Sequence, residues 1–406
     1  MSRSTAVQPK SMATLGSVEG NLTVGEDAII KGEGTPPKVN VYGTVTHQGD
    51  CTFQCSLSAE NLEGEGDATI QGSLEVRGRV RVREGRLNVR ENMTARKVDV
   101  ERSLVVGQNL ESEEVDVGGS VEVGGDTKVG DIDVGGRFTG IGKVIAKSID
   151  VGGSVTTESE VEVEDINVGG RVTIAGGQVA RVDVGGAFES KSSLRFDSID
   201  VGGAVKLSGK STGGDIDVGG SCKVDGDIEF GDVDVGGVTD ISGSAEGKSL
   251  DVGGVVRVGA SLRLSGKLDV GGRAEINDEL SAENVDVGGN LEARKIDVRD
   301  KVSVGGSLTA RDGTNASYVE IGRRGRVSGP IHANEVLVGE RAHVENVYAG
   351  KITMEEKAQA RNLYGASIYI ESRCSISGEV QYTESLRTEE DVLFKVPPAK
   401  VEKLPE

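Results

Sequence analysis

The sequence has few of the residues that build large compact cores. Among 406 residues there is no tryptophan, and only 3% are aromatic. Aromatic side chains supply much of the buried area of a globular core, so the two or three globular domains that about 400 residues would suggest are disfavoured. Glycine, with 61 residues, stands at about twice its average share. The apolar residues are mostly Val, Ile and Leu, which favour strands.

Other absences restrict location and partners. No apolar run approaches the length of a transmembrane helix, and the first residues, "MSRSTAVQPKSMATLG", lack the apolar stretch of a secretory signal. The four cysteines are irregularly spaced and do not form a disulfide framework. A net charge of -20 disfavours binding to nucleic acid or to an anionic membrane. We therefore expect a cytoplasmic protein with no nucleic-acid partner and no membrane insertion.

The sequence contains a long internal repeat. The stretch "SIDVGGSV" at residues 148–155 returns with small changes along the middle of the chain. Its acidic position is occupied in turn by Asp116, Asp133, Asp150, Asn167, Asp183, Asp200, Asp217, Asp234, Asp251, Asp269 and Asp286. The successive intervals in the numbering are 17, 17, 17, 16, 17, 17, 17, 17, 18 and 17. Self-similarity at a fixed period of this length indicates a solenoid.

Each repeat contains three short segments of alternating apolar residues. In one repeat the inward pairs are Ile216/Val218, Cys222/Val224 and Ile228/Phe230. Alternation with a period of two indicates strands with one buried face, and three strands with three bends make one winding of a triangular coil. The predicted fold is all-β, a single long right-handed parallel β-helix with about 16–18 residues per winding and flexible tails. The period alone does not set the handedness, which is taken from the general preference of parallel crossovers and from the family resemblance described below.

The pattern divides the chain into five zones. Residues 1–14 and 396–406 lack alternation and are predicted to be flexible tails, the second of them rich in proline. We expect irregular windings over residues 15–95, regular DVGG windings over residues 96–310, and 16-residue windings over residues 311–395. Dividing residues 15–395 by a period of 17 gives roughly 22 windings, which need no separate domains because each touches only its neighbours.

The DVGG motif is predicted to form a structural corner. Ile149 and Val151 should point inward and the acid between them outward. We expect the two glycines to follow a left-handed or crowded backbone that excludes a Cβ, and the Asp oxygen to accept from a glycine amide, as in an Asx turn. Two copies represent this corner motif: Asp150, Gly152, Gly153, Asp217, Gly219 and Gly220.

Stacked windings place the acids in a column. Carboxylates about 5 Å apart repel by roughly 1 kcal/mol per neighbour even in water, so turn amides, nearby Lys and Arg, or bound cations must compensate. A cation ladder would involve Asp133, Asp150, Asp200, Asp217, Asp234 and Asp251. Capping of turns is the simpler interpretation, and we expect neither a metal nor a cofactor.

Candidate catalytic and metal-binding residues are few. His47, Cys51 and Cys55 could begin a zinc site, but residues four apart in an extended strand lie about 13 Å from each other. The two cysteines fit inward pairs with Phe53 and Leu57 instead. Two further cysteines, Cys222 and Cys374, also occupy inward positions and are predicted core residues.

No motif predicts an enzyme. His332 and His343 are the remaining histidines, and hexapeptide-repeat acyltransferases place a catalytic histidine between subunits. Their signature should recur in every winding, whereas here only "VGGSVT" fits it. A β-helical enzyme acting on sugars or acyl groups is therefore the least favoured alternative.

A basic stripe lies near the N-terminal end. Val80 and Val82 alternate with arginines, so the arginines share an outward face. The candidates for lateral contact with an acidic face of a neighbouring molecule are Arg77, Arg79, Arg81 and Arg83. The alternative is an ordinary solvated face, and nucleic-acid binding would add aromatic platforms that this stripe lacks.

The two ends of a β-helix expose unpaired backbone unless something covers them. Neither terminus shows an amphipathic helix pattern, so we expect open ends that favour stacking of copies. The candidates for self-assembly are Leu15, Val18, Leu393 and Phe394.

The chain resembles a known family. The stretches "IGRRGRVSGPIHANEVLVGERAHVENVYAG" and "ASIYIESRCSISGEV", and the style of repeat over residues 16–396, are similar to the bactofilins and related polymer-forming cytoskeletal proteins. The resemblance implies a right-handed β-helix with disordered tails that forms nucleotide-independent filaments end to end and serves as a scaffold. It also implies a role for a terminal phenylalanine, for which Phe394 is the candidate. This chain is longer than a typical bactofilin core and lacks an N-terminal apolar patch, so membrane attachment is not carried over.

The favoured function is thus a cytoplasmic structural scaffold whose main partner is itself, as an end-to-end homopolymer that can also hold client proteins. The alternative is a non-polymeric solenoid that binds a partner protein or cations along its acidic Asp ladder.

Overall fold

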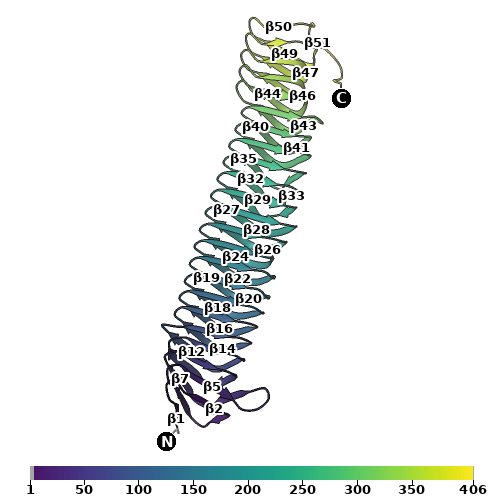
Figure 1. Ribbon diagram of the computed structural model, residues 1–406. Helices are drawn as coiled ribbons and strands as arrows, with labels where there is room; N and C mark the ends of the chain where they lie inside the picture. The colour runs from purple at the N-terminus through teal and green to yellow at the C-terminus, as the bar shows by residue number, and fades with distance from the viewer. Residues whose placement is uncertain (1–3, 406) are drawn as a thin grey trace. The chain divides into compact units, whose positions relative to one another are not determined.

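The computed structural model describes residues 4–405, and every regular element in them is a β-strand (Figure 1). The fold is an all-β parallel solenoid of about 23 turns. This confirms the solenoid predicted from the repeat. The chain comprises two compact units, residues 1–202 and residues 203–406, and their boundary falls inside the regular DVGG zone.

The strands of the N-terminal unit are β1 (Ser4–Val7), β2 (Met12–Leu15), β3 (Ser17–Val18), β4 (Asn21–Val24), β5 (Ala28–Gly32), β6 (Lys38–Val41), β7 (Thr44–Gln48), β8 (Cys51–Phe53), β9 (Ser56–Ala59), β10 (Asn61–Glu65), β11 (Ala68–Ile70), β12 (Leu74–Arg83), β13 (Arg86–Val89), β14 (Met93–Val100), β15 (Ser103–Val106), β16 (Leu110–Val117), β17 (Ser120–Val123), β18 (Thr127–Val134), β19 (Arg137–Gly140), β20 (Val144–Val151), β21 (Ser154–Thr157), β22 (Val161–Val168), β23 (Arg171–Ile174), β24 (Gly177–Val184), β25 (Ala187–Ser190) and β26 (Leu194–Val201).

The strands of the C-terminal unit are β27 (Ala204–Ser208), β28 (Ser211–Val218), β29 (Ser221–Asp225), β30 (Ile228–Glu229), β31 (Asp232–Val235), β32 (Val238–Ile241), β33 (Ala245–Gly247), β34 (Ser249–Val252), β35 (Val255–Val258), β36 (Leu262–Leu264), β37 (Lys267–Val270), β38 (Arg273–Ile276), β39 (Glu279–Val287), β40 (Asn290–Ala293), β41 (Lys295–Val304), β42 (Ser307–Ala310), β43 (Thr314–Ile321), β44 (Arg326–Ser328), β45 (Pro330–Val338), β46 (His343–Met354), β47 (Gln359–Ile370), β48 (Ser375–Ile376), β49 (Val380–Thr388), β50 (Leu393–Phe394) and β51 (Ala399–Lys400).

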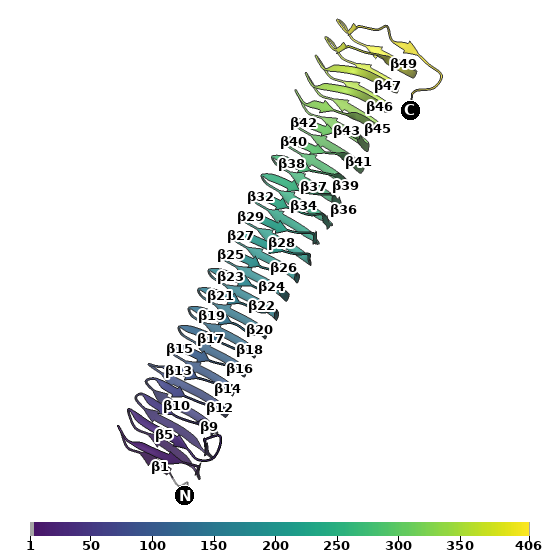
Figure 2. The same ribbon diagram turned by 45° about the vertical axis from the view of Figure 1, so that its right-hand side comes forward.

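Strands pair in parallel with the strand one winding later, as the stacked arrows within each unit show (Figure 2). In the N-terminal unit, Ile149 of β20 lies beside Ile166 of β22, the equivalent position of the next repeat. In the C-terminal unit, Leu250 pairs with Leu268 across the longest step of the repeat. The sequence period is therefore the distance between paired residues, including its one longer step.

The interior of each unit is filled by columns of aliphatic side chains. In β20, Val144, Ala146, Ile149 and Val151 are buried, and the residues between them face outward. The inward positions predicted for cysteine are correct, because all four cysteines are buried. Alternation of apolar and polar residues thus fixes which face of each short strand meets the core.

The DVGG corner is tight because corners of successive windings touch through their backbones. A Cβ on Gly152 would lie 2.4 Å from the carbonyl oxygen of Gly135, and a Cβ on Gly153 would lie 2.3 Å from that of Gly136. Neither Gly152 nor Gly153 has a positive φ. Of the two reasons predicted for glycine here, crowding is therefore the correct one.

The predicted Asx turn is wrong. The amide of Gly152 donates to the carbonyl of Val134 at 3.0 Å, and the amide of Gly153 donates to that of Gly136 at 3.0 Å. Both corner amides are thus bonded to the preceding winding, which leaves Asp150 facing solvent rather than capping the turn.

The second copy of the corner motif behaves in the same way. A Cβ on Gly220 would lie 2.3 Å from the carbonyl oxygen of Gly203. In the next winding, a Cβ on Gly236 would lie 2.5 Å from the carbonyl oxygen of Gly219. Asp217 is exposed between two buried residues of β28.

Both predicted tails contain strands. β1 lies within residues 1–14 and β2 begins there, and they pair with β4 and β5. The windings therefore already include residues before Leu15. Residues 396–406 contain β51, which pairs with β49. These short strands are held by backbone hydrogen bonds, which need no regular pattern of side chains. Residues 1–3 and 406 lie outside the described part of the chain.

Replacing a corner glycine tests the crowding. We expect Gly153→Ala to destabilise the protein by about 1–3 kcal/mol, because its methyl group would collide with a backbone carbonyl that cannot move aside. Urea unfolding followed by circular dichroism measures this change. Ser154→Ala is the control, since it adds no atoms beside the same corner. Equal unfolding midpoints for the two variants would contradict the crowding explanation.

Candidate assembly surfaces

The first winding has one unpaired edge. β1, β2 and β3 each pair with a single strand, β4, β5 and β6 respectively. Of the predicted contact residues, Leu15 ends β2 and is partly exposed, whereas Val18 lies in β3 and is buried. Ala13 pairs with the buried Ile30 and is also partly exposed. This edge therefore offers free backbone groups beside incompletely covered inward side chains.

The last winding is open in the same sense. β50 pairs only with β48, and β51 pairs only with β49. Phe394 stands over the buried Ile376 and is partly exposed, so it faces the open end. Leu393 pairs with Ser375 and is 69% exposed, so it points sideways. The structure thus places only Phe394, of these two predicted assembly residues, on the end surface.

Nothing helical covers either end among residues 4–405, because this part of the chain contains no helix. Proteins with exposed parallel strands usually protect such edges with a helix, a loop or charged side chains. The edges at β1–β3 and at β50–β51 are therefore paired on one side only among the described residues.

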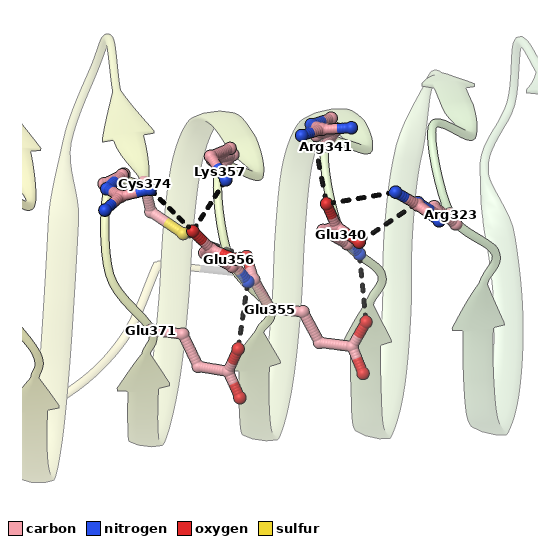
Figure 3. A network of polar contacts seen from close by, with 9 residues as sticks. Arg323, Glu340, Arg341, Glu355, Glu356, Lys357, Glu371 and Cys374 are labelled. Carbon is pink, nitrogen blue, oxygen red and sulfur yellow. Dashed lines mark hydrogen bonds and ion pairs between the residues drawn. The ribbon is translucent and has the colours of Figure 1, made fainter.

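The corners of the last windings carry a network of charged groups (Figure 3). The backbone amide of Glu340 donates to the carboxylate of Glu355 at 2.9 Å, and that of Glu356 donates to Glu371 at 3.0 Å. Arg323 pairs with Glu340 at 3.0 Å. Each corner is therefore fastened to the next by side chains as well as by backbone.

Cations of this network lower the pKa of one of its acids. Lys357 lies 2.7 Å from Glu356, and Arg373 lies 3.1 Å from the same carboxylate. The hydrogen bond from Lys357 is the largest cause that holds the pKa of Glu356 below its ordinary value. Glu356 is therefore an ion-pair partner in a contact between windings.

The Asp column forms as predicted. Asp116, Asp133 and Asp150 occupy equivalent positions in β16, β18 and β20. The pKa of Asp133 is raised, first by partial burial and then by the charges of its two neighbours. Like-charge repulsion in the column is therefore a physical effect of the stacking.

Side chains relieve this repulsion at intervals. The amide of Asn167 donates to Asp150 at 3.5 Å, and Lys267 lies 3.2 Å from Asp251 and 3.8 Å from Asp269. No group of three or more His, Cys, Asp or Glu within residues 4–405 is arranged to hold a metal ion. The cation ladder thus has no preformed site among the described residues. Two further members of the predicted set, Asp200 and Asp234, also lie opposite an aspartate of an adjacent winding, each within its own unit.

The arginine stripe has the predicted outward direction in β12. Arg79 and Arg81 both pair with Asp99 of the next winding, the second at 3.4 Å. Their charges are thus partly neutralised within the chain, which weakens their case as lateral contacts. Arg77 and Arg83 are exposed in the same strand.

A groove of about 940 Å³ is lined by stacked residues of strands β12, β14, β16, β18, β20, β22 and β24. Its floor contains small residues such as Ala95 and Ala146, and Ile145 is 36% exposed in one wall. Both acids and bases line the walls, and some of them pair with each other, as Arg96 does with Glu113 at 3.0 Å. The walls therefore do not select a ligand of one charge.

The histidines and cysteines do not gather into a metal-binding group within residues 4–405. His47 is 1% exposed with its Nδ1 3.0 Å from the carbonyl oxygen of Gly49, and burial lowers its pKa. Burial raises the pKa of Cys51 to about 12 and that of Cys55 to about 11, which disfavours thiolate ligands. The ring of His332 stacks on Tyr348 at 4.7 Å, and His343 is exposed at the start of β46.

Comparison with models of protein families, with curated proteins and with solved structures finds no match for this chain. Within residues 4–405 there is no helix of the length and apolarity that crossing a bilayer requires.

The sequence pattern also contains a signal at the ends that the repeat analysis missed. Residues 24–28 read VGEDA and residues 338–342 read VGERA. In both stretches the fourth residue has a positive φ, 56° at Asp27 and 58° at Arg341. The two ends of the coil therefore share a corner that the DVGG windings do not use.

The acid column can be tested by a pair of substitutions. In the folded chain the pKa of Asp133 is above its ordinary value of 3.8, so its charge destabilises the fold most at neutral pH and less as the pH falls. We expect Asp133→Asn to raise the unfolding midpoint at pH 7 and to lose this gain toward pH 4.

We expect Asp165→Asn to lower the unfolding midpoint at pH 7, the opposite of the change expected for Asp133→Asn. The hydrogen bond from Arg181 lowers the pKa of Asp165 below 3.8, so this carboxylate stabilises the fold at neutral pH, and the stabilisation disappears as pH falls through the lowered pKa. Thermal unfolding at low ionic strength measures both variants at pH 7, and a pH series that continues below 3.8 follows the loss of the Asp165 stabilisation. Shifts of the same sign at pH 7 would contradict this account.

Proposed function

We propose that this chain is a structural scaffold that assembles end to end into filaments without a nucleotide. The observation that carries the proposal is the pair of open ends, where β1–β3 and β50–β51 leave strand edges unpaired. A second copy is the occupant best matched to such an edge, because it can continue the same parallel hydrogen-bond ladder.

The inward side chains of the terminal windings support the same proposal. Ala13 and Leu15 in the first winding, and Leu386 and Phe394 in the last, are only partly covered. Their counterparts inside each unit, such as Ile30 and Ile376, are at most 1% exposed. Stacking of copies would bury this apolar surface, which is the main driving force for association. No chemical step is required, since the contact repeats what already holds neighbouring windings together.

A second candidate function is binding of a partner protein along one face without polymerisation. The groove of β12–β24, with its small apolar floor, is the observation that favours it. The two candidates differ in a simple measurement, because only the first predicts a concentration-dependent polymer of the purified chain. Binding of cations along the Asp ladder would instead show as a melting temperature lowered by EDTA.

Neighbouring residues in β50 give a matched pair of variants. We expect Phe394→Lys to raise the critical concentration for assembly by roughly tenfold or more, because it places an unpaired charge in the contact. Leu393→Lys should leave assembly nearly unchanged, since Leu393 points sideways and is 69% exposed.

Sedimentation of purified protein over a concentration series, together with negative-stain microscopy, provides the readout. Wild-type protein that remains dispersed at high concentration and varied salt would overturn the proposal. Equal effects of the two lysine variants would show that the end surface does not make the contact.

A further inference from the structure

The two ends of the coil are built with the same turn. We define the end corners as residues 8–11 and 25–28 in the N-terminal unit, and residues 322–325, 339–342, 355–358, 371–374 and 389–392 in the C-terminal unit. The third residue of every end corner has a left-handed backbone, with φ between 56° and 62°, and these residues are Lys10, Asp27, Arg324, Arg341, Lys357, Arg373 and Asp391. Non-glycine residues rarely adopt this conformation, so its return at one position of one corner is a specific structural match.

The hydrogen bonds between end corners also match. At the N-terminal end, three backbone bonds join the first two end corners. They run from the amides of Gly25, Lys10 and Ile29 to the carbonyls of Val7, Glu26 and Ser11, at 2.9, 2.7 and 2.9 Å. At the C-terminal end, the three bonds between the last two such corners run from Glu389, Arg373 and Leu393 to Ile370, Glu390 and Cys374, at 2.9, 3.2 and 2.9 Å. In both sets the donors are the first, third and fifth residues after the preceding strand. The acceptors are the last residue of that strand and the second and fourth residues after it.

The last corner of one copy therefore presents the backbone groups that the first corner of a second copy can bond. If the first winding of a second copy continued the stack, the amide of its Gln8 would face the carbonyl of Thr388. Its Pro9 carbonyl would accept from the amide of Asp391. Its partly covered Ala13 would stack on Phe394 in the same column of inward side chains. Because alanine is small, it would leave room for the phenylalanine ring. Each of these placements repeats a contact that the chain already makes between its own windings.

The charges are complementary in the same alignment. Within the C-terminal unit, Arg373 at the third corner position reaches back to Glu356 at the second position of the preceding corner, at 3.1 Å. The last corner has Glu390 at that second position, and the first corner has Lys10 at the third. Both side chains are exposed. The equivalent ion pair across a junction would join Lys10 of one copy to Glu390 of another.

We infer that copies of this chain join head to tail, with the first winding of one copy continuing the last end corner of the next and with Lys10 paired to Glu390. This inference rests on the proposed end-to-end assembly and adds its polarity and its register. A junction of two N-terminal ends would bring Lys10 close to itself and set strands antiparallel. A junction of two C-terminal ends would bring together two copies of the acidic run Glu389, Glu390 and Asp391.

Charge reversal tests the polarity. We expect Lys10→Glu and Glu390→Lys each to raise the critical concentration for assembly roughly three- to tenfold at low salt, since an exposed pair is replaced by like charges. The double variant should return to the wild-type value, because the pair is restored with its sign exchanged. An equal mixture of the two single variants should also assemble like wild type, by alternation of the two proteins. Lys31→Glu, an exposed reversal in β5 away from the corner, should change little.

The outcomes separate the two proposals. Absence of any wild-type polymer would overturn the proposed function. A wild-type polymer with no rescue in the double variant or in the mixture would overturn only the head-to-tail junction and leave end-to-end assembly in place.

Crosslinking provides an independent readout. The native cysteines are buried, so introduced surface thiols react selectively. With Lys10→Cys and Asp391→Cys in one chain, mild oxidation should give a ladder of multimers, since stacked corners bring equivalent residues to about 5 Å, within disulfide range. Each single cysteine variant should remain monomeric under denaturing conditions. Dimers from the Lys10→Cys variant alone would overturn the inference in favour of N-terminal to N-terminal contact.

Discussion

The structure depends on one constraint, the in-register parallel pairing of each residue with the residue one winding later. Through this pairing Ile149 faces Ile166 and Leu250 faces Leu268, although the second step is longer than the first. The corner can absorb an extra residue because the strands on either side keep their partners. Each winding is too small to bury its own apolar face, so the pairing and the core form together.

In-register pairing places each kind of residue in a column with its own kind. For aliphatic residues this is favourable, and for corner glycines it is required by the approach of the preceding carbonyl. For acids it is unfavourable, because the charges of Asp116 and Asp150 add to the effect of partial burial in raising the pKa of Asp133. The chain tolerates this column with occasional interruptions such as Asn167, which donates to Asp150, and with lysines from adjacent strands. One geometric rule thus explains both the stability of the core and the strain in the charged column.

The sequence predicts the parts of this protein that depend on side-chain alternation. The solenoid, its period, the inward cysteines and the outward arginines of β12 all follow from the spacing of apolar residues. The sequence did not reveal β1 and β2, because these strands are held by backbone bonds to β4 and β5 rather than by an aliphatic pattern. The partner of the Gly152 amide was missed for a related reason. An Asx turn is a local alternative, and the preceding winding competes for the same donor.

The candidate assembly surface was only partly predictable. Phe394 and Leu393 are adjacent, and their opposite directions depend on the register of a very short strand with its partner in the preceding winding. Lys10 and Glu390 carry no motif in isolation. Their significance comes from the left-handed corner that they share with five other windings, and the only trace in the sequence is the likeness of VGEDA to VGERA.

The interchangeable Gly-Gly corner has an evolutionary consequence. Any DVGG winding presents the same backbone to the winding before it as to the winding after it. Duplication or loss of one such segment in the gene would therefore leave every remaining interface intact, whereas the specialised turns at the two termini could not be exchanged for it. The number of central repeats is accordingly free to drift or to be selected, whereas under the proposed head-to-tail assembly the two ends would have to co-evolve as a matched pair.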